Sequence, residues 1–171
     1  MSLLTSSTLE FIERDKIRQS IDKYLNSINE EKQHRKDIIY MNIANEISKL
    51  SHAKRKQVGA ILVKNDCIIG EGYNGTPHGF DNTCETLNDE NELVTKPEVL
   101  HAESNVISKL ARSTNSSDGS TLYVTLSPCF ECSKLIIQSG IIRLVFLEEY
   151  RDVSGLILLN KYGIKIKHLG K

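Results

Sequence analysis

The sequence predicts an α/β fold of three layers, in which a mixed five-stranded sheet carries helices on both faces. Short β-branched apolar runs alternate with helical patterns over residues 58–169, as in strands joined by crossover helices. Only three residues, 64–66, separate the first two apolar runs, and this spacing predicts a hairpin. A hairpin followed by crossover connections gives a sheet with both antiparallel and parallel strands.

Each expected element of this domain is bounded by its own pattern of apolar residues and turn formers. The expected strands span residues 58–63, 67–73, 121–126, 142–148 and 164–169. The expected helices span residues 99–111, 129–139 and 153–162. Gly140 and Gly163 stand just beyond the last two helices, where glycine commonly ends a helix.

Two further amphipathic helices are expected before the sheet. Apolar residues recur at helical spacing between Ile17 and Ile28, and again between Ile39 and Leu50. The charged residues 29–36 between these stretches are interpreted as a solvated connection between two helices.

Length and composition indicate a globular protein with one main domain. The chain has 171 residues, of which 39% are apolar and 26% charged. We take residues 1–36 as an N-terminal helical extension and residues 37–171 as the α/β domain. The 22 basic residues balance the 22 acidic ones, so neither nucleic acid nor an anionic membrane is expected as a partner.

The sequence favours a cytoplasmic location. No run of about 18 apolar residues indicates a membrane-spanning helix, and the first eight residues lack the apolar core of a signal peptide. Cysteines in that compartment stay reduced, which favours a metal-binding or catalytic role over disulfides. The four cysteines are Cys67, Cys84, Cys129 and Cys132.

Two short motifs indicate a metal site. The first is His101-Ala102-Glu103, and the second, beginning 25 residues after Glu103, is Pro128-Cys129-Phe130-Glu131-Cys132. A Cys-x-x-Cys that opens a helix places two sulfurs on one turn, where the helix dipole favours thiolates. Zinc accepts two thiolates and an imidazole, here Cys129, Cys132 and His101, and its fourth position then stays open for water. An open position indicates catalysis.

Glu103 is not expected to bind the metal. It lies two residues after His101 at a helix start, so its carboxylate can stand beside the metal-bound water and move protons. The alternative is a closed zinc site that only stabilises the fold, with Cys67 or Cys84 as the fourth ligand. Neither cysteine has a ligand partner close in sequence, and Cys67, inside an apolar strand, is interpreted as a buried core thiol.

These motifs match the H-x-E…P-C-x-x-C signature of the zinc-dependent nucleoside and nucleotide deaminases, which the sequence resembles. Three longer segments resemble the deoxycytidylate deaminases in particular. They are GEGYNGTP at residues 70–77, LHAE at 100–103 and YVTLSPC at 123–129. The resemblance runs from about residue 38 to 169, and it implies a cytidine-deaminase-like fold with residues 37–171 as the catalytic domain.

The resemblance implies hydrolytic deamination of dCMP to dUMP and ammonia. One zinc ion per chain would activate water for attack on C4 of cytosine, and Glu103 would protonate N3 and then the departing amine. Some relatives carry an additional zinc ion, but residues 76–100 offer only His78 and Cys84 as soft ligands, so a second zinc is not expected.

The resemblance also assigns contacts with the substrate. The backbone N–H of Ala102 would donate to O2 of the base, the carbonyl of Ser127 would accept from its amine, and Asn74 would contact the sugar. Arg55 would bind the phosphate, since a guanidinium makes paired hydrogen bonds with it, and Tyr150 would close over the substrate. The alternative for Asn74 is an ordinary turn residue. The alternative for Arg55 and Tyr150 is a solvated surface side chain.

The segment Gly72-Tyr73-Asn74-Gly75 resembles the region where deoxycytidylate deaminases bind their regulators. The resemblance implies dCTP as activator and dTTP as inhibitor, with Mg²⁺ on the triphosphate. Relatives form homohexamers, which implies that this chain also assembles.

Two other functions remain open at this point. The first is an enzyme that deaminates dCTP or cytidine as well, and the second is a deoxynucleotide-sensing module without turnover. The intact His101, Glu103, Cys129 and Cys132 argue against the sensor. Deaminases of tRNA adenosine share the metal motif, but a chain without net charge attracts a polyanion poorly.

Overall fold

The computed structural model describes the backbone of residues 6–170 and the side chains of residues 14–170. The chain divides into two compact units, whose boundary lies between Asp37 and Ile38. The helix α1 (Ser6–Ser48) begins in the first unit and ends in the second. None of the described helices combines the length with the apolar composition that crossing a membrane demands.

The expected break between two N-terminal helices is wrong, because residues 29–36 are helical and belong to α1. This segment is rich in Glu, Lys, Gln and Arg, which form helices well, and it contains neither glycine nor proline. Its side chains are mostly exposed. The run of charges therefore marks the solvated surface of a helix rather than a loop.

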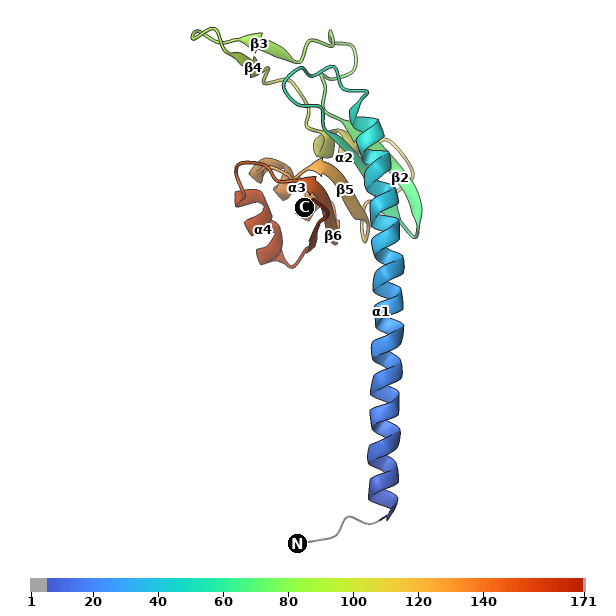
Figure 1. Cartoon of the computed structure of the whole chain (residues 1–171). Helices are drawn as coiled ribbons and strands as arrows, with labels where there is room; N and C mark the ends of the chain where they lie inside the picture. The colour runs from blue at the N-terminus through green and yellow to red at the C-terminus, as the bar shows by residue number, and fades with distance from the viewer. Residues whose placement is uncertain (1–5, 171) are drawn as a thin grey trace. The chain divides into compact units, whose positions relative to one another are not determined.

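Five strands form one mixed sheet, as the sequence predicts, and several of them are labelled in Figure 1. Their order in the sheet is β2-β1-β5-β6-β7. They are β1 (Gly59–Lys64), β2 (Cys67–Tyr73), β5 (Thr121–Leu126), β6 (Arg143–Glu148) and β7 (Lys165–His168). β1 pairs antiparallel with β2 and β5, whereas β6 runs parallel to both β5 and β7. Asn65 and Asp66 have positive φ angles, 50° and 61°, as a tight hairpin turn between β1 and β2 requires.

Three helices of the second unit lie between these strands along the chain. α2 (Ala102–Leu110) precedes β5, α3 (Phe130–Gln138) joins β5 to β6, and α4 (Ser154–Tyr162) joins β6 to β7. The helix expected at residues 99–111 begins only at Ala102, because His101 is extended and forms the N-cap. Gly140 and Gly163 have φ angles of 74° and 97°, which confirms their predicted place after α3 and α4.

Two clusters of buried residues lie on opposite faces of the sheet. The first includes Val106, Ile136 and Leu159, which come from α2, α3 and α4. The second includes Met41, from the part of α1 that belongs to the second unit. Residues of β1 and β5 alternate between the two clusters, because successive side chains of a strand point to opposite faces. Helices therefore cover both faces, which confirms the predicted fold class.

A short second sheet was not expected from the sequence. β3 (Glu85–Leu87) and β4 (Leu93–Thr95) pair antiparallel around a polar turn, residues 88–92, in which Asn91 has a φ angle of 60°. Two apolar-polar runs around such a turn are the signal of a hairpin. With three residues each, these runs are too short for their periodicity to distinguish strand from loop.

The interpretation of Cys67 as a buried thiol is wrong, because this side chain is exposed. Cys67 is the first residue of β2, and β2 is the outermost strand of the sheet beside a hairpin turn. A strand at the edge of a sheet has no neighbouring strand on one side, so the side chain at its end can be exposed even within an apolar run.

Candidate active site

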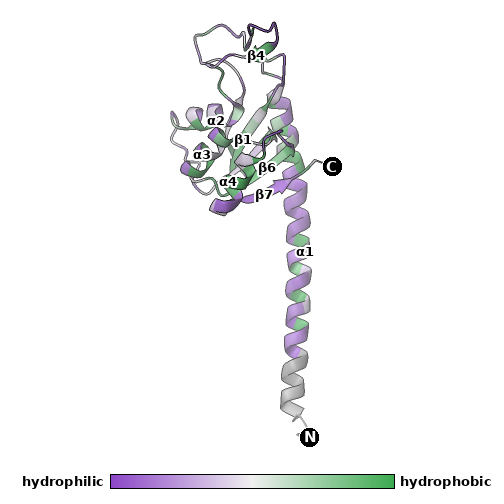
Figure 2. Cartoon of the chain, turned by 90° about the vertical axis from the view of Figure 1, so that its left-hand side faces the viewer, coloured by the Kyte–Doolittle hydropathy of each residue, from purple (hydrophilic) through white to green (hydrophobic). Residues whose placement is uncertain are grey.

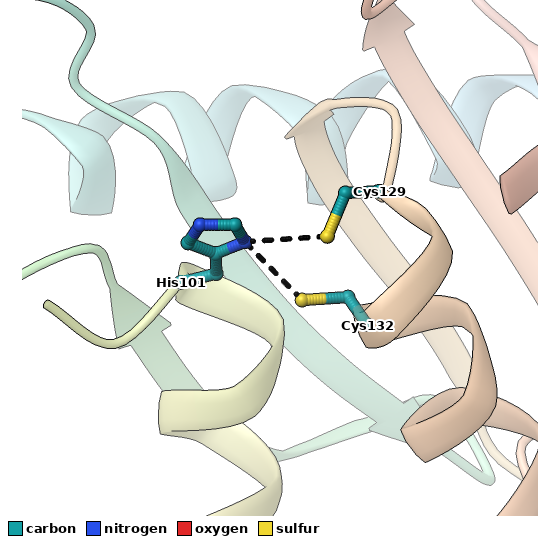
Figure 3. A group of neighbouring side chains, drawn as sticks. All are labelled: His101, Cys129 and Cys132. Carbon is teal, nitrogen blue, oxygen red and sulfur yellow. Dashed lines mark hydrogen bonds between the residues drawn. The ribbon is translucent and has the colours of Figure 1, made fainter. Parts of the chain in front are cut away.

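Three metal-ligating side chains meet where α2 and α3 begin (Figure 3). His101 is the N-cap of α2, Cys129 is the N-cap of α3, and Cys132 lies in the first turn of α3. Nδ1 of His101 lies 3.5 Å from Sγ of Cys129 and 3.4 Å from Sγ of Cys132. Ligand atoms about 2.0–2.3 Å from a tetrahedral zinc ion lie roughly 3.5 Å from one another. The donor set and its spacing therefore fit zinc.

Hydrogen bonds within this cluster set the protonation of the two sulfurs. Bonds from Cys132 and then from His101 lower the pKa of Cys129 to about 3, so its sulfur is a thiolate. The bond to Cys129, followed by burial, raises the pKa of the Cys132 thiol. The pKa of His101 is also raised, chiefly by its bond with Cys129. A metal ion held by these residues would replace the shared protons, because it takes thiolates and neutral imidazole as ligands.

Glu103 is a buried carboxyl group in the first turn of α2, two residues from His101. The residue is only 4% exposed. Burial is the main reason why its pKa is raised to about 6. A carboxyl group that titrates near neutral pH can accept a proton and return it within one reaction cycle. Glu103 thus has the protonation behaviour that a proton shuttle needs.

A cavity of about 350 Å³ opens beside the cluster. Its volume is in the range of sites that bind small molecules. The structure brings together, around this cavity, every predicted catalytic, metal-binding and substrate-binding residue except the buried Cys132. The residues concerned are Arg55, Asn74, His101, Ala102, Glu103, Ser127, Cys129 and Tyr150.

Hydrogen bonds tie two of the residues expected to contact the substrate to neighbouring segments. Oδ1 of Asn74 accepts the N–H of Val58 at 2.8 Å, and its Nδ2 donates to the carbonyl of Lys56 at 2.9 Å. The amide keeps one N–H and one lone pair for a ligand. Oγ of Ser127 accepts the backbone N–H of Tyr150 at 2.8 Å. Asn74 therefore holds the segment before β1, and Ser127 holds the segment after β6.

Arg55 is held by two residues that the sequence analysis missed. Nη1 of Arg55 donates to Oγ1 of Thr95 at 3.1 Å. Oε1 of Glu85 accepts the backbone N–H groups of Lys54 and Arg55 at 2.9 and 3.2 Å. Glu85 is 7% exposed, and both Glu85 and Thr95 line the cavity. The unexpected β3–β4 hairpin therefore positions the arginine that the resemblance assigns to phosphate.

One ion pair joins two segments near this cavity. Nζ of Lys56, a residue that lines the cavity, contacts Oε2 of Glu148 at the end of β6. Both side chains are about half exposed, so solvent screens the attraction and the pair contributes roughly 0–1 kcal/mol.

The segment assigned to regulators is divided between two cavities. Tyr73 and Gly75 line a second cavity of about 370 Å³, together with Lys109, whose Nζ lies 5.4 Å from the centre of the Tyr73 ring. Asn74 lines the first cavity instead. Gly72 lines neither of the two cavities. β2 packs so tightly against α2 at this point that a Cβ atom on Gly72 would collide with the helix backbone.

Known proteins match most of this chain. A family described as "Cytidine and deoxycytidylate deaminase zinc-binding region" matches residues 34–148. The deoxycytidylate deaminase of Enterobacteria phage T4 is 34% identical over 147 residues, which cover 64% of this chain and 76% of that protein. The deoxycytidylate deaminase of Homo sapiens is 37% identical over 139 residues. The match covers 75% of this chain and 76% of that protein.

A solved structure matches as well. It is that of the dCMP deaminase from the cyanophage S-TIM5 in complex with dCMP and dUMP. Its TM-score is 0.72 and its sequence identity 43%, and the match covers 77% of this chain and 94% of that one.

We expect the purified chain to contain one zinc ion and the variant Cys132→Ser to lose it, because a hydroxyl is a far poorer zinc ligand than a thiolate. Atomic emission on gel-filtered protein gives the metal content per chain. The matched control is Cys67→Ser, which changes an exposed cysteine outside the cluster and should leave the zinc in place. Zinc retained by Cys132→Ser, or four protein donors in an X-ray absorption spectrum, would contradict the assignment.

Proposed function

This chain belongs to the cytidine and deoxycytidylate deaminase family, and we propose that it hydrolyses dCMP to dUMP and ammonia. One observation carries the proposal: a single cavity is lined by His101, Cys129 and Glu103 and also by Arg55. The first three residues suit hydrolysis of an amine on a base, and the guanidinium suits a phosphate group. The 43% identical deaminase solved with dCMP and dUMP supports the same substrate.

The chain supplies metal ligands and a proton carrier for this reaction. Zinc held by His101, Cys129 and Cys132 would supply a Lewis acid that lowers the pKa of water. Glu103 accepts the proton that the water gives up and delivers it to N3 of cytosine. It then carries the second proton of the water to the amine, which leaves as ammonia while the water oxygen stays on C4. A pKa of about 6 lets Glu103 act in both directions.

Backbone groups beside Glu103 and Cys129 orient the base. We assign the N–H of Ala102 to O2 and the carbonyl of Ser127 to the exocyclic amine. Asn74 offers its remaining N–H to the sugar, and Arg55 binds the phosphate. The support for these assignments is that all four residues line the cavity that Glu103 lines.

Replacing Glu103 by glutamine should lower turnover of dCMP about a thousandfold, because the amide cannot carry protons, whereas the zinc content should not change. Ammonia release measures turnover, and atomic emission measures the metal. The matched control Glu131→Gln changes an exposed carboxylate of α3 and should keep full activity. Turnover by Glu103→Gln within tenfold of the unmodified chain would refute the role of Glu103. A zinc-loaded chain that binds nucleotide without releasing ammonia would establish the sensor instead.

Replacing Arg55 by alanine should lower kcat/KM for dCMP about 10–100-fold and leave deoxycytidine almost unaffected, because only the nucleotide loses a charge-assisted hydrogen bond. The same panel includes CMP and dCTP, which tests the alternative of a broader deaminase. Lys54→Ala is the matched control, since its exposed side chain neighbours Arg55 but does not line the cavity. An equal loss for dCMP and deoxycytidine would mean that Arg55 does not contact the phosphate.

We further propose that the second cavity binds the regulators, dCTP as activator and dTTP as inhibitor. Tyr73 and Gly75 line it, and Lys109 brings a positive charge that suits a triphosphate. The catalytic domain, residues 37–171, would hold both cavities. The homohexamer, the Mg²⁺ ion on the triphosphate and the cytoplasmic location stay predictions from the sequence.

Replacing Lys109 by alanine should raise the half-maximal concentrations of dCTP and dTTP at least about tenfold, with little change in basal turnover of dCMP. Initial rates at low dCMP concentration, with Mg²⁺ present, measure both responses. Lys134→Ala, an exposed lysine on α3, is the matched control. Unchanged responses in Lys109→Ala would place the regulators elsewhere, and absent responses in the unmodified chain would remove the proposal.

A further inference from the structure

The first unit of the chain exposes a stripe of large apolar side chains. Ile17, Ile21, Tyr24 and Leu25 are 60%, 52%, 66% and 51% exposed. Figure 2 colours the ribbon of α1 mostly hydrophilic, with hydrophobic segments at intervals along it. Single exposed apolar residues are common on proteins, but four grouped on adjacent turns of one helix indicate a contact surface.

The spacing of the stripe is that of a coiled coil. Ile17, Ile21, Tyr24 and the half-buried Ile28 alternate steps of four and three residues, so they occupy the a and d positions of a heptad repeat. The same repeat places Arg14 and Glu31 at the next positions outward, where both side chains are exposed. The seam is therefore apolar in its middle, with the positive charge of Arg14 at one end and the negative charge of Glu31 at the other.

We propose that this seam packs antiparallel against the same seam of a second copy of the chain. In the register that centres the apolar residues, Ile21 faces the partner's Tyr24 and Ile17 faces the partner's Ile28. Arg14 then faces the partner's Glu31. By the two-fold symmetry of such a contact, Glu31 also faces the partner's Arg14. Four apolar layers are thus closed at each end by a pair of opposite charges.

Charge distinguishes this arrangement from a parallel one. In a parallel pair each residue faces its own copy, so Arg14 would meet the partner's Arg14 and Glu31 would meet the partner's Glu31. Like charges at adjoining positions of a seam repel, whereas opposite charges there stabilise the pairing and fix its direction. The pattern is therefore self-complementary only when the two helices run in opposite directions.

Neither the family match nor the catalytic cavity accounts for this surface. The family match begins at residue 34, after the whole of the seam. No residue that lines the cavity lies before Arg55. The contact is consequently separate from any assembly of the catalytic domain and from the proposed reaction.

Sedimentation equilibrium of the full-length chain tests the proposal through a charge exchange. Arg14→Glu and Glu31→Arg each create two like-charge pairs per dimer, and each should raise the dissociation constant at least about tenfold at moderate salt. The double variant restores opposite charges in the antiparallel register and should return to within about threefold of the unmodified chain. Ile21→Asp should abolish the contact. Lys16→Glu, the same charge change on the outer side of the helix, is the matched control.

The outcomes separate the possible arrangements. Weakening by each single variant and recovery in the double variant support the antiparallel pair. Single variants that leave association unchanged, while Ile21→Asp abolishes it, indicate a parallel pair, in which each exchange only replaces one like-charge pair by another. Single variants that weaken association without recovery in the double variant indicate another apolar partner. Either result overturns the proposal. A chain whose association state none of the variants changes overturns it too. Turnover of dCMP, measured alongside, should stay unchanged in every variant, so this failure would be distinct from failure of the proposed reaction.

Discussion

The site depends on two helices that begin beside each other. α2 and α3 each start with a metal-ligating residue at the N-cap, and the turn after each cap supplies Glu103 or Cys132. Close packing keeps the start of α3 in place. Gly155 of α4 lies so near the backbone of Pro128 and Cys129 that a Cβ atom would collide with it. The position of Cys129 thus depends on a glycine of α4 that carries no reacting group of its own.

Regular and irregular parts of the second unit serve different purposes. Helix starts carry the groups that we propose to act on the base, and these helices pack on the buried core of the sheet. Arg55, assigned to the phosphate, and Tyr150, assigned to closing over the substrate, lie in loops that Glu85, Asn74 and Ser127 fix by hydrogen bonds. Loops held in this way can differ between relatives in their choice of substrate without disturbing the reaction.

The sequence predicted the five-stranded sheet and the cluster of His101, Cys129 and Cys132, because apolar periodicity and short motifs are local signals. It did not predict that residues 29–36 continue a helix, because charge alone does not distinguish a loop from a solvated helix surface. The contact between Glu85 and the backbone of Arg55 joins residues 30 positions apart. No local pattern announces such a bond, since it arises only when the β3–β4 hairpin folds against the cavity.

The ion pair between Lys56 and Glu148 makes one contact beside the cavity sensitive to salt. It joins Lys56, which lies before β1 and lines the cavity, to the end of β6. A bond this weak breaks at little cost, and dissolved ions weaken it further. Added salt should therefore loosen this contact at the rim of the cavity, whereas the carboxyl group of Glu103, a residue only 4% exposed, is shielded from the same ions.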